Sequence, residues 1–286
     1  MASKLKPVFI SAYVTLLAVG SIQALYNIVF KSPIGGWVGV LLALGPMLYF
    51  FIKLFMTDTA RTDPELRNYR LLTWLGGLIT VYFGWSTPDY AIQILYSGFV
   101  GIFGIALYLN WYSKFENRET TALSVGNPLP DFILQDENGN SISSDAFIGS
   151  PTLIIFYRGN WCPLCMAQIK EVSAQYQQLA DLGVAVALVS PQPHENTRNL
   201  AKKFSVPFKF LVDTENAAAK KLGIFAEDGT PKGLELLGYD SDTVMPTVII
   251  TDAQGNIIFA DLTDNYRVRP EPDTFIQILK EHTVAP

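Results

Sequence analysis

Two cysteines, Cys162 and Cys165, are separated by two residues, and they are the only cysteines in a chain of 286 residues. An apolar run at 152–156 precedes them, and apolar residues spaced three or four apart follow at 166, 169, 172, 176 and 179. This pattern predicts a buried strand, a turn that carries the thiols, and a helix that begins there. Because a helix N-terminus favours a thiolate, we expect a redox-active dithiol in which the pKa of Cys162 is lowered towards about 7.

Composition argues against a zinc site, a structural disulfide and nucleic-acid binding as alternatives to a redox-active dithiol. A Cys-x-x-Cys pair also occurs in zinc sites, but such sites have four ligands, and the chain offers only His194 and His282, neither at zinc-finger spacing. A disulfide between the two cysteines closes too small a loop to hold a fold together. The net charge of -5 gives no reason to expect nucleic acid. We therefore expect no metal, no cofactor and no nucleic acid, with a pair of inert buried thiols as the remaining alternative.

The first 118 residues predict an all-α transmembrane domain. Long apolar segments indicate four spans, at about 7–30, 34–54, 70–86 and 90–112, because roughly 20 residues cross a hydrocarbon core of about 30 Å. The third span is the shortest and the weakest. Lys4 and Lys6 precede the first span as in a signal peptide, but the apolar run is too long for one, so an uncleaved anchor is expected.

The distribution of Lys and Arg in the short loops predicts the orientation of the spans. With four spans, only Lys31 lies outside, and the inside holds Lys4, Lys6, Lys53, Arg61, Arg67, Arg70, Lys114 and Arg118. This asymmetry predicts an integral protein of a bacterial inner membrane, or of a comparable organelle membrane, with the N-terminus and the redox domain in the cytoplasm. If 70–86 does not cross, the redox domain is extracytoplasmic.

Residues 119–286 have the pattern of a soluble α/β domain. Strands are predicted at 132–135, 141–143, 152–156, 184–190, 208–212, 248–251 and 257–260, and helices from the cysteines onward and at 197–204, 216–222 and 273–282. The run at 184–190 is apolar throughout, as in a strand covered on both faces. Alternating β and α units with a hairpin near the end predict a mixed central sheet.

Four segments carry a resemblance to a known family: Val125–Phe132, Phe156–Cys165, Phe208–Asp213 and Met245–Asp252. They resemble the thioredoxin-fold antioxidant proteins, and most of all the peroxiredoxin-like (AhpC/TSA-type) branch that carries CPxC. The resemblance covers about 120–283 and leaves the membrane half out. It implies that Met245 and Pro246 form a cis-proline turn facing the cysteines. The segment 264–272 also resembles this branch, which implies site roles for Tyr266 and Arg269.

Two chemistries are open to this family. In its peroxidases the reactive cysteine follows a Pro-x-x-x-Thr/Ser-x-x pattern, and an arginine on a later strand stabilises the thiolate. Here Ile155 and Gly159 occupy the proline and threonine positions, and Pro246 aligns with the arginine. The departures favour a membrane-anchored thiol-disulfide oxidoreductase of redox homeostasis, in which Cys162 attacks a substrate disulfide and Cys165 resolves the mixed disulfide.

Neighbouring residues are expected to shape this site. Trp161 either covers the thiol or packs in the core, Pro163 starts the helix, and Arg158 either serves the site or pairs on the surface. The expected partners are a disulfide or hydroperoxide substrate, an external thioredoxin- or glutathione-like reductant, and the lipid bilayer. The first alternative is a thiol-dependent peroxidase that reduces hydroperoxides, those of lipids included. The second is a non-catalytic, membrane-tethered binding module.

Overall fold

The computed structural model describes residues 2–115, 118 and 120–283. The chain divides into two compact units. A helical unit comprises Leu5–Thr57 and Thr62–Lys114, and an α/β unit comprises Met1–Lys4, Asp58–Arg61 and Phe115–Pro286. The boundary expected between 118 and 119 falls next to residues 116–117 and 119, which lie outside the described residues.

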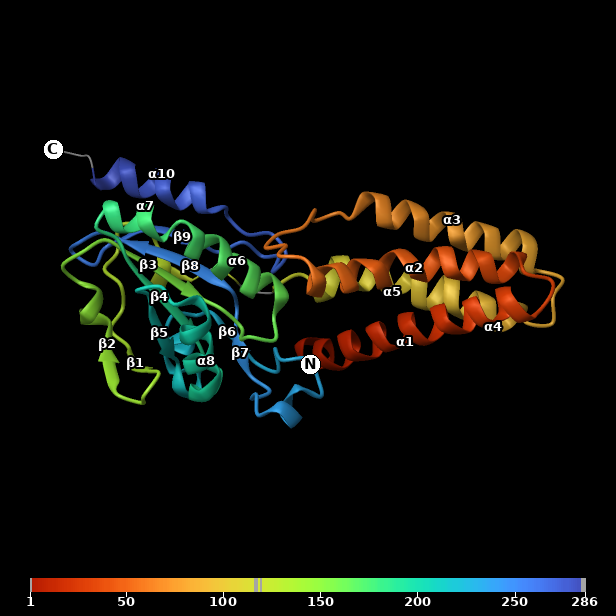
Figure 1. Cartoon of the computed structure of the whole chain (residues 1–286), viewed down its shortest axis with the longest axis horizontal. Coiled ribbons are helices and arrows are strands. Elements are labelled where there is room, and N and C mark those ends of the chain that lie inside the picture. Colours follow the sequence, from red (N-terminus) through yellow and green to blue (C-terminus); the bar gives the residue numbers. More distant parts are fainter. Residues whose placement is uncertain (1, 116–117, 119, 284–286) are drawn as a thin grey trace. The chain divides into compact units, whose positions relative to one another are not determined.

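The helical unit contains the four expected helical segments (Figure 1). Three of those described, Lys6–Phe30, Gly35–Met56 and Tyr90–Tyr112, are long and apolar enough to cross a membrane. The expected third span is also a helix, but it is not among these three, and its first turn carries two arginines. The segments are α1 (Ala2–Phe30), α2 (Gly35–Met56), α3 (Arg67–Gly84), and a last helix made of α4 (Tyr90–Ile94), a π-helical stretch (Leu95–Phe103), α5 (Gly104–Leu107) and a second π-helical stretch (Tyr108–Tyr112).

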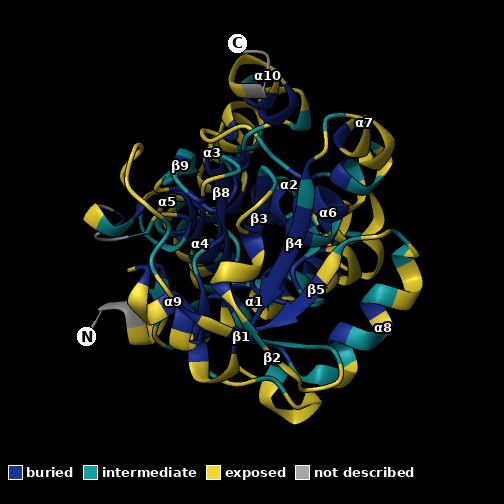
Figure 2. Ribbon diagram, turned by 90° about the vertical axis from the view of Figure 1, so that its left-hand side faces the viewer, coloured by how far each residue is buried: buried dark blue, intermediate teal, exposed yellow. Residues whose placement is uncertain are grey.

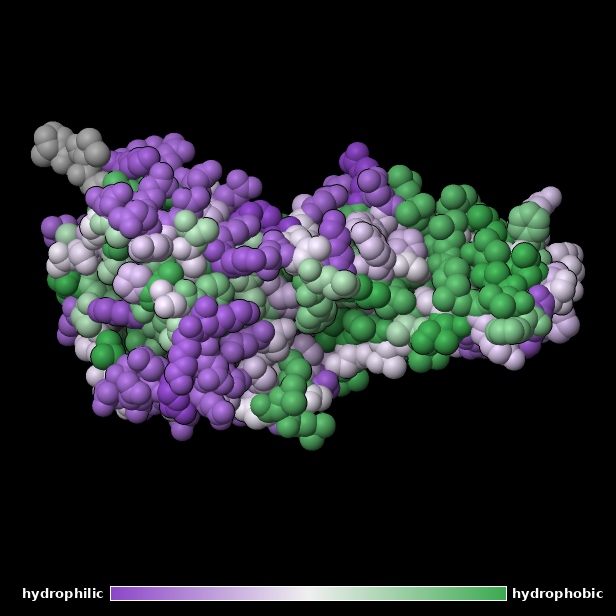
Figure 3. Space-filling view, viewed as in Figure 1, coloured by the Kyte–Doolittle hydropathy of each residue, from purple (hydrophilic) through white to green (hydrophobic). Residues whose placement is uncertain are grey.

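Helices α2 and α3 pack closely because glycines face each other along their contact. A Cβ atom on Gly76 would lie 2.3 Å from the backbone nitrogen of Ala43, and one on Gly39 would lie 2.5 Å from that of Thr80. Small residues of this kind allow helix backbones to approach in an apolar medium. The outer faces of this unit carry exposed apolar side chains, among them Ile22, Phe55, Leu78 and Phe99. Figure 3 shows a largely green, hydrophobic surface over the helices.

The α/β unit is built on a mixed seven-stranded sheet in the order β2-β1-β5-β4-β3-β8-β9. Strands β3, β4 and β5 are parallel, and the other neighbours are antiparallel. The strands are β1 (Ile133–Asp136), β2 (Ser141–Ser143), β3 (Thr152–Phe156), β4 (Ala185–Ser190), β5 (Lys209–Val212), β8 (Thr247–Thr251) and β9 (Ile257–Asp261). The predicted α/β domain with a mixed central sheet is therefore confirmed.

Helices cover the sheet and bury its central strands. Every residue of β3 and β8 is buried, and Figure 2 shows β3 and β4 in dark blue while the outer turns of α8 and α10 are yellow. The helices are α6 (Pro163–Ala174), α7 (Tyr176–Asp181), α8 (His194–Phe204), α9 (Ala217–Lys221) and α10 (Pro272–Thr283). Helix α6 follows β3 and connects it to the parallel strand β4, so α6 begins at the carboxyl end of β3.

Some short elements were not expected from the sequence. A two-stranded sheet pairs β6 (Phe225–Ala226) with β7 (Thr243–Val244), and the segment 227–242 connects them. Such short strands carry too little periodicity to predict. Four 3-10 helices are also present, at Thr121–Leu123, Ser144–Phe147, Thr214–Asn216 and Leu234–Leu237.

Candidate functional site

The two thiols lie at the start of α6, where the sequence placed them. Cys162 is the N-cap residue of the helix, and its Sγ accepts a hydrogen bond from the backbone N–H of Cys165 at 3.3 Å. Pro163 occupies the first helical position, where its missing N–H removes no helical bond. Both cysteines are free thiols, and both are buried, with Cys162 2% exposed and Cys165 fully covered. The geometry presents a reduced pair in which the two sulfurs interact.

A buried arginine, Arg269, lies against the thiol of Cys165, which we call the inner thiol. The Nη2 of Arg269 donates to the Sγ of Cys165 at 3.4 Å, and its Nη1 donates to Oε1 of Gln168 at 2.7 Å. Its Nε donates to the carbonyl oxygen of Tyr266 at 3.1 Å. Arg269 is only 6% exposed, so its charge acts where water screens it little. The guanidinium is held at three points, and one of them is the sulfur.

These contacts place the negative charge of the pair on Cys165. Burial raises its pKa, but a hydrogen bond from Cys162 and the charge of Arg269 outweigh burial, and the pKa of Cys165 falls to about 5. Burial, the hydrogen bond to Cys165 and the charge on Cys165 together raise the pKa of Cys162 well above its ordinary value. The expected lowering at Cys162 is therefore wrong. The pair holds one proton between two sulfurs, and the arginine contacts the inner sulfur.

Arg158 belongs to the site rather than to the surface. It is 8% exposed, and its guanidinium carbon lies 4.6 Å from the ring centroid of Trp161 and 5.6 Å from that of Tyr266. Its Nη2 donates to the carbonyl oxygen of Gly229, and its backbone N–H donates to Cys165. The half-buried Trp161 therefore stacks on a cation as well as flanking Cys162. A second arginine thus lies at the thiol pair.

The turn before the cysteines requires glycine. Gly159 has a φ of +148°, and a Cβ atom there would lie 2.8 Å from Nε1 of Trp161. A threonine cannot occupy this position without moving the indole, which accounts for the missing hydroxyl of the peroxidase pattern. Asn160 completes the turn by donating its backbone N–H to Oε1 of Gln192 at 2.9 Å. The loop shape, rather than a motif hydroxyl, holds the thiol pair in place.

Met245 and Pro246 lie at the same end of the sheet as the thiols, but their geometry differs from the prediction. Ser32–Pro33 is the cis peptide bond among the residues described, so Met245–Pro246 is trans and the expected cis-proline turn is wrong. The trans form is the ordinary one for a peptide bond that precedes proline. The carbonyl of Met245 accepts from the hydroxyl of Thr247, and that of Pro246 accepts from Arg118.

The structure brings together most of the expected site residues and adds one that the sequence analysis missed. Of the two residues expected from resemblance alone, Arg269 contacts Cys165, and Tyr266 lies beside Arg158 and Arg269. Gln168 is 2% exposed and holds Arg269, yet it was not singled out. A polar residue three positions after Cys165 on a mostly buried helix face was the available signal. Among the described residues, no group of three His, Cys, Asp or Glu side chains is placed to hold a metal ion.

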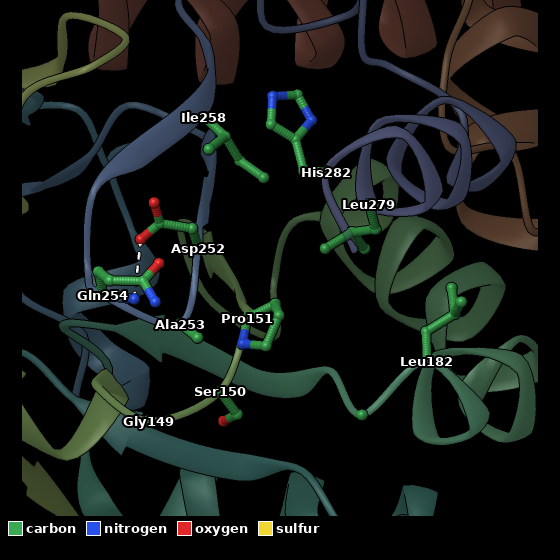
Figure 4. Close-up of a pocket in the computed structure, with 11 residues that line it drawn as sticks. Gly149, Ser150, Pro151, Leu182, Asp252, Ala253, Gln254, Ile258, Leu279 and His282 are labelled. Atoms are coloured by element: carbon green, nitrogen blue, oxygen red, sulfur yellow. Dashed lines mark hydrogen bonds between the residues drawn. The ribbon is translucent and has the colours of Figure 1, made fainter. Parts of the chain in front are cut away.

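A surface pocket of about 390 Å³ lies at the opposite end of the sheet (Figure 4). It is lined by residues that precede β3 and β4, by the β8–β9 turn and by α10, including Pro151, Leu182, Asp252 and His282. The Asp252 carboxylate already accepts hydrogen bonds from Gln254 and Asn256 within that turn. This pocket lies away from the thiols, and its carboxylate is engaged in shaping the turn.

The chain is similar to known proteins over its α/β unit. The AhpC/TSA family signature matches residues 125–260. The chloroplastic peroxiredoxin Q of Sedum lineare is 30% identical over 134 residues, which are 46% of this chain and 72% of that protein. Peroxiredoxin Bcp of Escherichia coli K12 is 25% identical over 160 residues, 56% of this chain and 97% of that protein. The crystal structure of peroxidoxin BcpB from Mycobacterium tuberculosis superposes on 57% of this chain and 99% of its own, at 15% identity and a TM-score of 0.47.

The signature covers the strand, turn and helix that carry both cysteines, and it ends before Arg269. The helical unit lies outside it. The chain belongs to the AhpC/TSA family, and its α/β unit is a peroxiredoxin-like oxidoreductase domain with a thioredoxin-like fold.

Proposed function

We propose that this protein is a thiol-dependent peroxidase in which Cys162 reduces a hydroperoxide and Cys165 resolves the product. The observation that carries the proposal is the guanidinium of Arg269 on the buried thiol pair. The sequence favoured disulfide exchange because the proline and threonine of the peroxidase pattern are missing and no arginine stands at the expected strand position. Arg269 supplies that charge from a different segment, and the peroxiredoxin relatives favour the same chemistry. A cation at the reacting sulfurs stabilises both the thiolate and the charge that develops on the leaving oxygen.

The proposed reaction starts with the proton on Cys162 and the charge on Cys165. The Cys162 proton first passes to Cys165, and the resulting Cys162 thiolate attacks the terminal peroxide oxygen as the O–O bond breaks. The departing alkoxide takes that proton and leaves as an alcohol, so Cys162 becomes a sulfenic acid and Cys165 is a thiolate again. Cys165 then attacks the Cys162 sulfur, and hydroxide leaves and is protonated to water. An external dithiol reduces the resulting disulfide.

Single-cysteine variants of the full chain test this assignment. Cys162→Ser should abolish single-turnover reduction of hydroperoxide by the reduced protein. Cys165→Ser should still consume one equivalent of peroxide and accumulate a sulfenic acid, detected by a sulfenic-acid-specific reagent. If Cys165→Ser is the inactive variant and Cys162→Ser is not, the roles are reversed. If wild-type protein reduces insulin disulfides but leaves peroxide untouched, the exchanger is the correct function. Inactivity in both assays favours the binding module.

We also propose that the preferred substrates are apolar hydroperoxides. Segment 227–242 reaches the site, since the Gly229 carbonyl accepts from Arg158. The same segment carries Leu236 and Leu237, which are 91% and 68% exposed. Exposed leucines of this kind offer contact to an acyl chain rather than to hydrogen peroxide. Leu236→Ser/Leu237→Ser should lower kcat/KM for a fatty-acid hydroperoxide and leave that for hydrogen peroxide unchanged; an equal effect on both contradicts the preference.

We propose that the helical unit spans a membrane four times and leaves both its ends on the Lys/Arg-rich cytoplasmic side. Helix α3 supports this although it is the least apolar, because it runs antiparallel to α2 along its length. Near one end Tyr69 contacts Phe50, in the middle Gly76 meets Ala43, and at the other end Phe83 lies against Gly35. Reporter domains fused after Pro286 test this topology. A cytoplasm-specific reporter should be active, whereas activity of an extracytoplasmic reporter would mean that three helices cross.

A further inference from the structure

Arg61 is a residue of the α/β unit that comes from a distant part of the sequence. It belongs to the short segment Asp58–Arg61, which lies between α2 and α3 in the chain but groups with the α/β unit. Its Nη1 and Nη2 donate to Oε1 and Oε2 of Glu171 at 3.2 and 2.5 Å. The Nε and Nη2 also donate to the carbonyl oxygens of Arg269 and Pro270 at 3.2 and 3.4 Å. One guanidinium therefore binds both a helix and a loop.

Arg61 joins the two elements that form the contact at the thiols: α6, which carries Cys165, and the loop that carries Arg269. Glu171 lies on α6, six residues after Cys165, and the loop 265–270 presents Arg269. The distance between α6 and this loop determines whether the Arg269 guanidinium reaches the Cys165 sulfur at 3.4 Å. Two cross-links connect the elements. The inner one joins Arg269 to Cys165 and Gln168, and the outer one joins Arg61 to Glu171 and to the loop carbonyls.

We propose that Arg61 is a positioning residue that fixes Arg269 against Cys165 by joining α6 to the 265–270 loop. This inference rests on the proposed function, because it concerns how the resolving thiol is kept ready to react. The loop 265–270 belongs to no strand, and side-chain contacts from Arg269 connect it to α6. The Arg61 side chain is 27% exposed and that of Glu171 is 32% exposed, so their ion pair is partly shielded from water. A planar guanidinium suits the role because it donates to a carboxylate and to carbonyls at once.

The nearby ion pair between Lys170 and Asp58 provides a matched control. It joins the same two segments, Asp58–Arg61 and α6, but it does not reach the 265–270 loop. The side chains of Lys170 and Asp58 are 62% and 65% exposed, and exposed pairs of this kind contribute little. Removing Lys170 therefore changes a charge on α6 next to Glu171 without releasing Arg269. The charged or titratable groups that face Cys165 are Cys162, Arg158, Arg269 and Tyr157.

The test is a pH titration of the thiolate in reduced, full-length protein, followed by ultraviolet absorbance and by the rate of alkylation at Cys165. Arg61→Ala should raise the midpoint by about one pH unit, since an opposite charge close to an acid shifts its pKa by roughly 1 to 3 units and here it is displaced rather than removed. Arg269→Ala should raise it further. Adding Arg61→Ala to Arg269→Ala should change nothing more, because Arg61 acts through Arg269. Lys170→Ala should titrate as wild type.

An unchanged midpoint in Arg61→Ala overturns the inference, as does an effect of Arg61→Ala that persists in full when Arg269 is already absent. If Arg61→Ala does not fold, Glu171→Ala tests the same link from the other side. Arg61→Lys should bring the titration midpoint only part of the way back to the wild-type value. The readout is independent of the proposed peroxidase. Wild-type protein that ignores peroxide refutes the function and leaves the titration result to decide the role of Arg61.

Discussion

Replacing Arg269 with glutamine tests the charge distribution at the thiol pair most directly. Glutamine keeps a hydrogen-bond donor on a shorter side chain and removes the cation 3.4 Å from the Cys165 sulfur. With the arginine present, the pKa of Cys165 is about 5. An opposite charge at this distance accounts for roughly 1 to 3 pKa units. We therefore expect the pKa of Cys165 in Arg269→Gln to lie between about 6 and about 8.

The sign of the effect follows from the thiol being an acid. Lowering the pH protonates Cys165, so the variant needs a higher pH to reach the same thiolate fraction. At about pH 7 that fraction should fall from about 99% to between roughly 90% and 10%. The lowered pKa also stabilises the reduced fold at pH values above the ordinary thiol pKa, and this contribution is lost as the pH falls through about 5. The variant should lose it at a higher pH.

The assay is the ultraviolet absorbance of the thiolate as a function of pH in fully reduced protein. Alkylation followed by mass spectrometry then assigns the charge to Cys162 or to Cys165. Arg198→Gln is a suitable control, since Arg198 lies on α8, its Nη1 donates to the carbonyl oxygen of Glu137, and it is not part of the thiol site. A midpoint that is unchanged in Arg269→Gln, or a first thiolate that maps to Cys162, would refute the reasoning.

Three further substitutions test how the fold supports the site. Gly159→Thr should cost about 1 to 3 kcal/mol of unfolding free energy, because φ is +148° and the new Cβ meets Trp161; an unchanged melting temperature contradicts this. Asp213→Ala should cost about 1 to 3 kcal/mol, because the buried carboxylate accepts two backbone N–H bonds of α9 at 2.8 Å, and Asp213→Asn should lose less in the same denaturant titration. Gly76→Leu should weaken the α2–α3 contact and lower thermal stability in detergent, whereas Gly98→Leu, with open space around its Cβ, should not; equal effects would count against the packing.

Local sequence patterns were sufficient to predict the frame that holds the thiols. Hydrophobic periodicity placed β3, the turn and α6 in the correct order, and Cys162 is the N-cap residue at the predicted helix start. The strands of the central sheet and α10 also follow from residue type and spacing over a few positions. These features depend on neighbours in the chain, so they can be predicted without a tertiary structure.

The charge distribution within the pair could not be predicted in this way. The helix start alone favoured a thiolate at Cys162, but the sulfur that contacts Arg269 is that of Cys165, 104 residues away in sequence. The bond from Arg61 to Glu171 spans 110 residues, and no local period indicates it.

The sequence by itself determined that two thiols stand at the start of a helix, at the carboxyl end of a buried strand, in a chain with long apolar helices. The tertiary structure alone decided which thiol carries the charge and which side chains hold the charge in place. The physical reason is distance. Periodicity is set by neighbouring residues, whereas the pKa of a buried thiol is set by whichever cation the fold brings within a few ångströms of it.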